Sequence, residues 1–138
     1  MTLALPAAAV REAPPLHQVV HGPITFIARC ERHDQTYVGC AFVGYLPTGA
    51  HLGPSALTRI VRRASRTHDA RMARRVATMV QVCVRPAGVA ALIESAHRCG
   101  GLGIAAGGGL PWRAAWCGRY EDDARLRSEF LARCGTAR

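Results

Sequence analysis

The sequence predicts an α+β fold in a single domain. Segments at about 18–29 and 35–46 alternate in the manner of strands, and two further strands are expected at about 89–99 and 111–119. Segments with helical spacing lie between the second and third strands and after the fourth. With 138 residues, the chain is long enough for one hydrophobic core. We therefore expect one domain over 18–138.

The first helix is expected to open at Gly53-Pro54-Ser55, with Ser55 or its neighbour as the N-cap. Leu57, Ile60 and Val61 form its expected buried stripe. Arginines occupy the expected solvent side: Arg62, Arg63 and Arg66.

The next segment fits two patterns. Val80–Val84 alternates like a strand, yet apolar residues also recur at helical spacing from Met72 to Cys83. Periodicity alone leaves both open. The last helix is expected to begin at Glu121-Asp122-Asp123, where acids favour the positive end of the helix dipole, with Leu126, Phe130 and Leu131 on its apolar face.

Residues 1–17 are rich in Ala and Pro without a period, so we expect a flexible N-terminal arm. The sequence has no signal peptide and no run of 18 apolar residues, which favours a cytoplasmic location without membrane contact. Thiols stay reduced there. Four of the cysteines are expected to be small buried residues: Cys40, Cys83, Cys117 and Cys134.

The net charge of +9 suggests an anionic partner. Nucleic acid is disfavoured, because the densest basic cluster, 59–75, has no interleaved aromatic residues for stacking on bases. A small phosphorylated or carboxylated substrate, or a solvated surface, explains the charge better.

A zinc site is indicated by the turn Cys30-Glu31-Arg32-His33 between the first two strands. A thiolate and an imidazole three residues apart can share one Zn²⁺, and Cys99 is the best third ligand. His97 would share a strand face with Cys99. Three protein ligands beside a proton carrier are typical of catalytic zinc, which keeps a position for water.

These motifs resemble the GTP cyclohydrolase I family, whose members have the T-fold. The family's Cys-Glu-His-His turn appears as 30–33, its Gly-Leu-Ser-Lys-x-x-Arg-Ile-Val as 53–61, and its strand with histidine and cysteine as 94–99. The resemblance implies an antiparallel four-stranded sheet with a helix pair between strands two and three, in the order β-β-α-α-β-β-α. It also makes the segment with two possible patterns a helix, expected from about Asp69 to Val84, and it implies homo-oligomers whose active sites lie between subunits.

The resemblance also implies roles for individual residues. Cys30, His33 and Cys99 match the zinc ligands, and His97 matches a histidine that handles protons. Ser55 and Arg59 match positions on the triphosphate and ribose side of the substrate.

Other positions depart from the family. Arg32 replaces a proton-shuttling histidine, and a guanidinium does not exchange protons near neutral pH. Ala56 and Gly103 replace cations, and Arg71-Met72 aligns with the Gln-Glu pair that binds guanine.

Because the metal ligands are kept and the substrate-binding residues are not, the sequence favours a zinc-dependent hydrolase or cyclase that acts on a substrate other than GTP. In this hypothesis His97 is the general acid or base, and Arg32 and Arg71 bind an anionic substrate. Two alternatives remain: a divergent GTP cyclohydrolase with substitute arginines, and a non-catalytic zinc-stabilised oligomer that binds a ligand.

Overall fold

The computed structural model describes residues 17–30, 35–66, 71–95 and 112–135. Four strands form one antiparallel sheet in the order β1-β2-β3-β4. Their bounds are Val19–Cys30, Gln35–Tyr45, Gly88–Ser95 and Trp112–Gly118. The expected α+β class and the strand order are confirmed.

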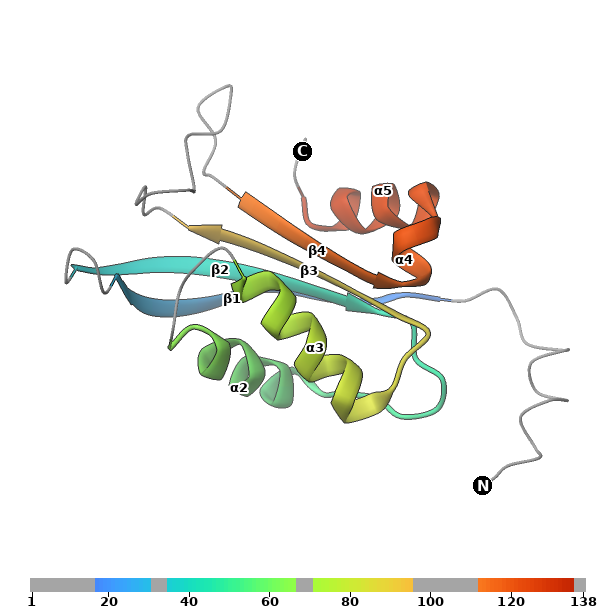
Figure 1. Cartoon of the computed structure of the whole chain (residues 1–138), viewed down its shortest axis with the longest axis horizontal. Coiled ribbons are helices and arrows are strands. Elements are labelled where there is room, and N and C mark those ends of the chain that lie inside the picture. The colour runs from blue at the N-terminus through green and yellow to red at the C-terminus, as the bar shows by residue number, and fades with distance from the viewer. Residues whose placement is uncertain (1–16, 31–34, 67–70, 96–111, 136–138) are drawn as a thin grey trace, which may run out of the picture.

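Helices cover both faces of the sheet (Figure 1). The pair α2 (Pro54–Ala64) and α3 (Met72–Val84) packs on one face. The helices α4 (Arg119–Asp122) and α5 (Ala124–Arg133) pack on the other. The expected order of elements is confirmed, except that the last helix is divided in two.

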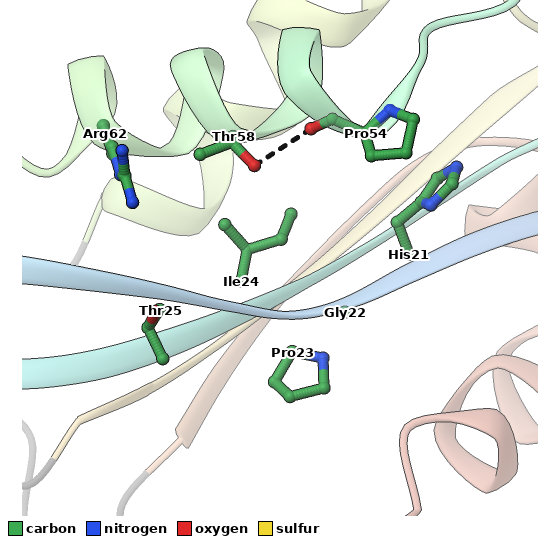
Figure 2. A pocket seen from close by; sticks show the side chains of 8 residues that line it. All are labelled: His21, Gly22, Pro23, Ile24, Thr25, Pro54, Thr58 and Arg62. Carbon is green, nitrogen blue, oxygen red and sulfur yellow. Dashed lines mark hydrogen bonds between the residues drawn. The ribbon is translucent and has the colours of Figure 1, made fainter.

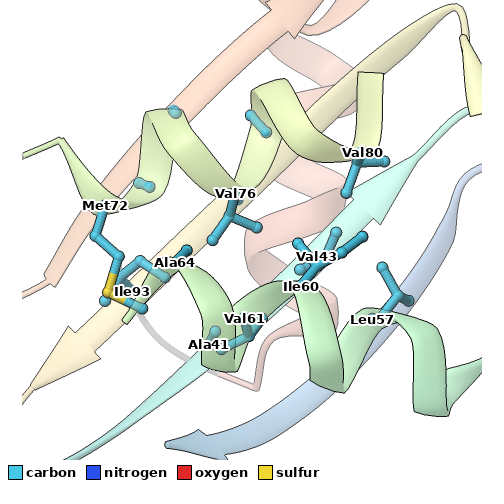
Figure 3. Close-up of a cluster of buried hydrophobic side chains, with 14 of the residues drawn as sticks. Ala41, Val43, Leu57, Ile60, Val61, Ala64, Met72, Val76, Val80 and Ile93 are labelled. Carbon is cyan, nitrogen blue, oxygen red and sulfur yellow. The ribbon is translucent and has the colours of Figure 1, made fainter. Parts of the chain in front are cut away.

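The larger core lies between the sheet and the helix pair (Figure 3). Leu57, Ile60, Val61 and Ala64 are buried from α2, in agreement with the expected stripe. Burial of each large apolar side chain contributes about 1.5–3 kcal/mol, so this layer is the main source of stability. The strands contribute alternate residues, including Phe26, Ala41, Val43, Val89, Ala91 and Ile93.

The segment with two possible patterns is the helix α3. Met72, Val76 and Val80 recur every fourth residue and are buried against the sheet, whereas Val82 is 71% exposed. The helix ends where Arg85 adopts a left-handed conformation with φ of 45°, and the Arg85 amide donates to the Gln81 carbonyl. Helical periodicity therefore predominates over the alternation.

Two helix starts differ from the expectation. Gly53, not Ser55, is the N-cap of α2, and no side chain caps it, because the proline at the first helical position already removes one amide donor. Asp123 separates α4 from α5 and caps α5, with its Oδ1 accepting from the amides of Arg125 and Leu126 at 3.0 and 3.2 Å.

The cysteines also differ in part from the expectation. Cys134 is buried in the core between the sheet and α5. Cys40 and Cys117 are half-buried. Cys83 is exposed, because it lies on the solvent side of α3 next to Val82. The expected burial of Cys83 is therefore wrong.

A buried polar network joins the beginning of the described domain to its end. Gln18 is 6% exposed; its Nε2 donates to Glu129 Oε1 at 2.8 Å, and its Oε1 accepts from the Tyr120 hydroxyl at 2.9 Å. Arg133 Nη1 donates to the Gln18 carbonyl at 3.0 Å. These contacts fix α5 against the start of β1.

None of the helices in the described ranges is both long and apolar enough to cross a membrane. The expected arm at 1–17 lies outside the described residues except for His17, which is exposed.

Candidate functional site

Three chain segments reach the same end of the sheet. Cys30 pairs with Gln35 across the β1–β2 hairpin, and Ser95, the last residue of β3, pairs with Gly39 on β2. The first residue of β4, Trp112, pairs with Glu94. Consequently β1 and β3, which precede the two halves of the predicted zinc site, both end here on either side of β2 (Figure 1).

Half of the predicted site residues lie outside the described ranges: Arg32, His33, His97 and Cys99. Cys30 is described as the last residue of β1. Among the residues that are described, no group of three His, Cys, Asp or Glu side chains could hold a metal ion. The predicted ligand set therefore stays a prediction.

Arg71 lies at this end of the sheet. It directly precedes α3, whose first residue, Met72, lies next to Ile93 near the end of β3 (Figure 3). The Arg71 side chain is exposed. A substrate held near the ends of β1 and β3 could therefore contact Arg71.

Met72, which aligns with a guanine-binding position of the family, is a core residue. Its side chain is 1% exposed and packs with Ala64 and Ile93, so it cannot touch a substrate. This burial is consistent with the expectation that a guanine-binding residue is missing at this position.

Ser55 lies away from this end of the sheet. Ser55 and Arg59 are both exposed on α2, and Pro54, which precedes Ser55, lies beside His21 near the start of β1. From His21, β1 runs to Cys30, a distance of roughly 25–30 Å at about 3.3 Å per residue. One chain thus does not bring Ser55 together with the end of β1.

Sequence patterns did not predict a cavity of about 280 Å³ between β1 and α2. The register of β1 and β2 shifts between His21 and Ile24, and His21, Thr25, Thr58 and Arg62 line the space (Figure 2). A cis peptide bond precedes Pro23 in this segment. The only sequence signal was Gly22-Pro23 inside a strand, where a bulge is favoured.

Two buried groups on the opposite face of the sheet have shifted proton affinities. Burial and the neighbouring Cys40 thiol raise the pKa of Cys134 to about 12. Burial and the nearby Glu129 carboxylate raise the pKa of the Tyr120 phenol above its usual range. Both groups stay protonated at neutral pH, which suits a structural role for this face.

The family profile described as GTP cyclohydrolase I matches residues 7–135. The chain belongs to the GTP cyclohydrolase I family. It is 32% identical over 117 residues to GTP cyclohydrolase 1 of Dictyostelium discoideum, covering 83% of this chain and 50% of that one. It is 32% identical over 116 residues to the Homo sapiens enzyme, covering 82% and 46%.

The relative from Methylococcus capsulatus (strain ATCC 33009 / NCIMB 11132 / Bath), also named GTP cyclohydrolase 1, is 31% identical over 126 residues, covering 89% of this chain and 68% of that one. The chain spans about half the length of most of the curated relatives that it matches.

Among solved structures, the archaeosine synthase QueF-Like in the apo form has a similar fold. The TM-score is 0.57 with 18% identity, covering 78% of this chain and 97% of that one. At this identity the likeness concerns the fold alone. Together with the sheet and its helix pair, it confirms that this member of the GTP cyclohydrolase I family has a T-fold.

Proposed function

We propose that this family member is a zinc-dependent hydrolase or cyclase acting on a small anionic substrate other than GTP. One observation carries the proposal: the sequence keeps Cys30, His33, Cys99 and His97 but has Ala56 and Gly103 where the family places cations. If the enzyme had simply lost its function, substitutions would be expected in the metal-binding residues as well as in the substrate-binding residues.

The chain path supports a shared metal site. Ser95 pairs with Gly39, and Cys30 pairs with Gln35 on the same strand. The stretch from Ser95 to Cys99 is as long as that from Gly39 to Gln35, about 13 Å when extended. Cys99 is therefore within reach of the hairpin end that carries Cys30.

The donor set fits zinc, since two thiolates and one imidazole are ligands that Zn²⁺ prefers. When bound, zinc would supply Lewis-acid polarisation or a hydroxide at neutral pH. In the proposed mechanism His97 gives or takes the proton at the reacting atom. Arg32 and Arg71 hold an acidic group of the substrate, because guanidinium binds carboxylate and phosphate in a bidentate manner.

The proposed site is shared between copies of the chain in a homo-oligomeric ring. Ser55, near the start of β1, is too far from the end of this strand to meet the same small substrate in one chain, so we infer that a second copy provides it. The outer strands β1 and β4 have open edges in the sheet, and ring closure would pair them. Light scattering at micromolar concentration should show an oligomer, and a monomer would contradict the shared site.

The curated relatives favour a second candidate, a divergent GTP cyclohydrolase. Against this candidate, Met72 stands where the family has a guanine-binding carboxylate, and its buried thioether cannot replace that group. Every relative described above is named GTP cyclohydrolase 1. What still disfavours GTP is the loss of two cations and of the shuttling histidine at position 32.

The deciding experiment incubates zinc-loaded protein with GTP and follows pterin absorbance. Each lost contact to a charged group costs about 1.5–3 kcal/mol, so we expect turnover at least several hundred-fold below that of a family enzyme assayed in parallel. Robust turnover would establish the second candidate instead.

If GTP is inert, a screen of small anionic substrates compares the wild type with His97→Ala. The matched control is His17→Ala, because His17 is exposed and has no hydrogen bond or ion pair with the described residues. An activity lost only with His97 supports an enzyme. If the wild type and both variants bind a substrate but none of them converts it, the result would instead support a non-catalytic binding oligomer.

A further inference from the structure

The cavity between β1 and α2 is formed by an irregularity in an outer strand. Where the β1–β2 register shifts, Gly22 and Pro23 have no partner on β2, and the strand bends. The cavity is about 280 Å³, near the lower limit of small-molecule sites. It is therefore large enough for one small ligand.

The lining is polar at its two ends and apolar in the middle. In Figure 2, Arg62 on α2 lies at one end and His21 on β1 at the other, with Ile24 between them. The Thr58 hydroxyl donates to the Pro54 carbonyl at 2.9 Å, so its proton is already used. The remaining donors on the α2 side of β1 are the Arg62 guanidinium and the His21 ring. Thr25 pairs with Cys40, so its hydroxyl lies on the opposite face of the sheet.

The positive charge in this cavity is not neutralised by the described part of the chain. Within the described residues, neither the Arg62 guanidinium nor the His21 ring has a hydrogen bond or ion pair, although the Arg62 carbonyl accepts from the Ser65 hydroxyl at 2.9 Å. Neither β1 nor α2 contains an aspartate or glutamate. Arg62 can therefore accept an external anion without breaking an internal contact.

We propose that this cavity binds a small organic phosphate. The phosphate contacts Arg62, the apolar body of the ligand covers Ile24, and His21 binds a polar group at the far end. A phosphate dianion suits a planar guanidinium better than a carboxylate does, because it offers more charge and more acceptor oxygens. The cavity lies along β1 away from Cys30, so the proposal does not depend on the zinc site.

Isothermal titration tests the proposal with inorganic phosphate, phenyl phosphate and benzoate as probes, on the full chain at low ionic strength. We expect phenyl phosphate to bind several-fold more tightly than inorganic phosphate, because its ring covers Ile24. Benzoate should bind more weakly than phenyl phosphate. Arg62→Gln should lower the affinity for phenyl phosphate by about tenfold.

The matched control is Arg63→Gln. Arg63 is also exposed on α2 and carries the same charge, but it does not line the cavity. Arg63→Gln should keep the wild-type affinity for phenyl phosphate, apart from a small loss because one positive charge is removed from the surface. Equal losses in the two variants would show general attraction to a basic surface, and no binding of phenyl phosphate to the wild type would contradict the proposal directly.

Thermal unfolding of both variants checks that they are folded. The titration measures binding and not catalysis. It can therefore confirm the phosphate site in a protein without hydrolase activity, and it can contradict the site in an active enzyme.

Discussion

The ring of Phe26 fills the space that a side chain at Gly39 would need. The two residues are paired across β1 and β2, and a Cβ at Gly39 would lie 2.4 Å from Phe26 Cζ and 2.7 Å from the Glu94 carbonyl oxygen. Only glycine fits here without a shift of the ring or the neighbouring backbone. The glycine at this position therefore has a packing role.

Gly39→Ala should lower the free energy of unfolding by about 1–3 kcal/mol, because an extra methyl group overfills this part of the core. Urea unfolding measures it. Combining Gly39→Ala with Phe26→Leu, which shortens the obstructing side chain, should cost less than the sum of the single changes. Strict additivity would show that the ring is not the obstacle.

Purified protein should contain one zinc per chain, and Cys99→Ala should lose most of it, since two ligands hold zinc far less tightly than three. Cys83→Ala is the matched control, because Cys83 is an exposed thiol on α3. Metal analysis by mass spectrometry gives the ratio. Full occupancy in Cys99→Ala would remove Cys99 from the site.

Tyr120→Phe should destabilise the domain by about 1–2 kcal/mol, because it deprives the buried Gln18 Oε1 of its 2.9 Å donor. Chemical denaturation checks the magnitude. If the network acts as a unit, adding Gln18→Ala to Tyr120→Phe should cost less than the two single changes together. Additive effects would show that Tyr120 and Gln18 do not act as a unit.

Stability should fall in alkaline solution as the pH passes from about 9 to about 12. The pKa of Cys134 is about 12 in the folded protein, against a usual value of 9.0, so over this interval the unfolded chain loses a proton that the folded chain keeps. The stabilisation is complete below the unfolded pKa and is lost as the pH rises.

Cys134→Ala should make this decline shallower, and Cys83→Ala, which alters an exposed thiol, should not. Unfolding free energies at several pH values provide the comparison. The pKa of the Tyr120 phenol is also raised, so this group contributes to the same loss of stability with rising pH, and part of the decline will remain in both variants. An identical slope in Cys134→Ala and wild type would contradict the assignment.

Periodicity predicted most of the fold because it reports burial directly. The stripe of Leu57, Ile60 and Val61 was sufficient for α2. For α3, Val80–Val84 alternated as well, and the chain by itself did not exclude a strand. Only the spacing from Met72 onward, together with the family resemblance, predicted the helix correctly.

The candidate site was less predictable, since it depends on distances between remote segments. An alignment with a site position does not say whether the residue lines a pocket or fills a core, and only the structure shows that Met72 is a core residue. The separation of Ser55 from Arg71 follows from the direction of α2 along β1. The bulge at Gly22-Pro23 created a cavity that no motif marks.

The contacts among Gln18, Glu129 and Arg133 bring the first and last described elements side by side. A short linker between them could therefore close the chain into a circle without stretching any strand. New ends could then be opened elsewhere, for instance in the connection between β2 and α2, with every strand pairing kept. For an engineer, such a circularly permuted chain moves the termini away from α5 and provides a different attachment point for fusion or surface display.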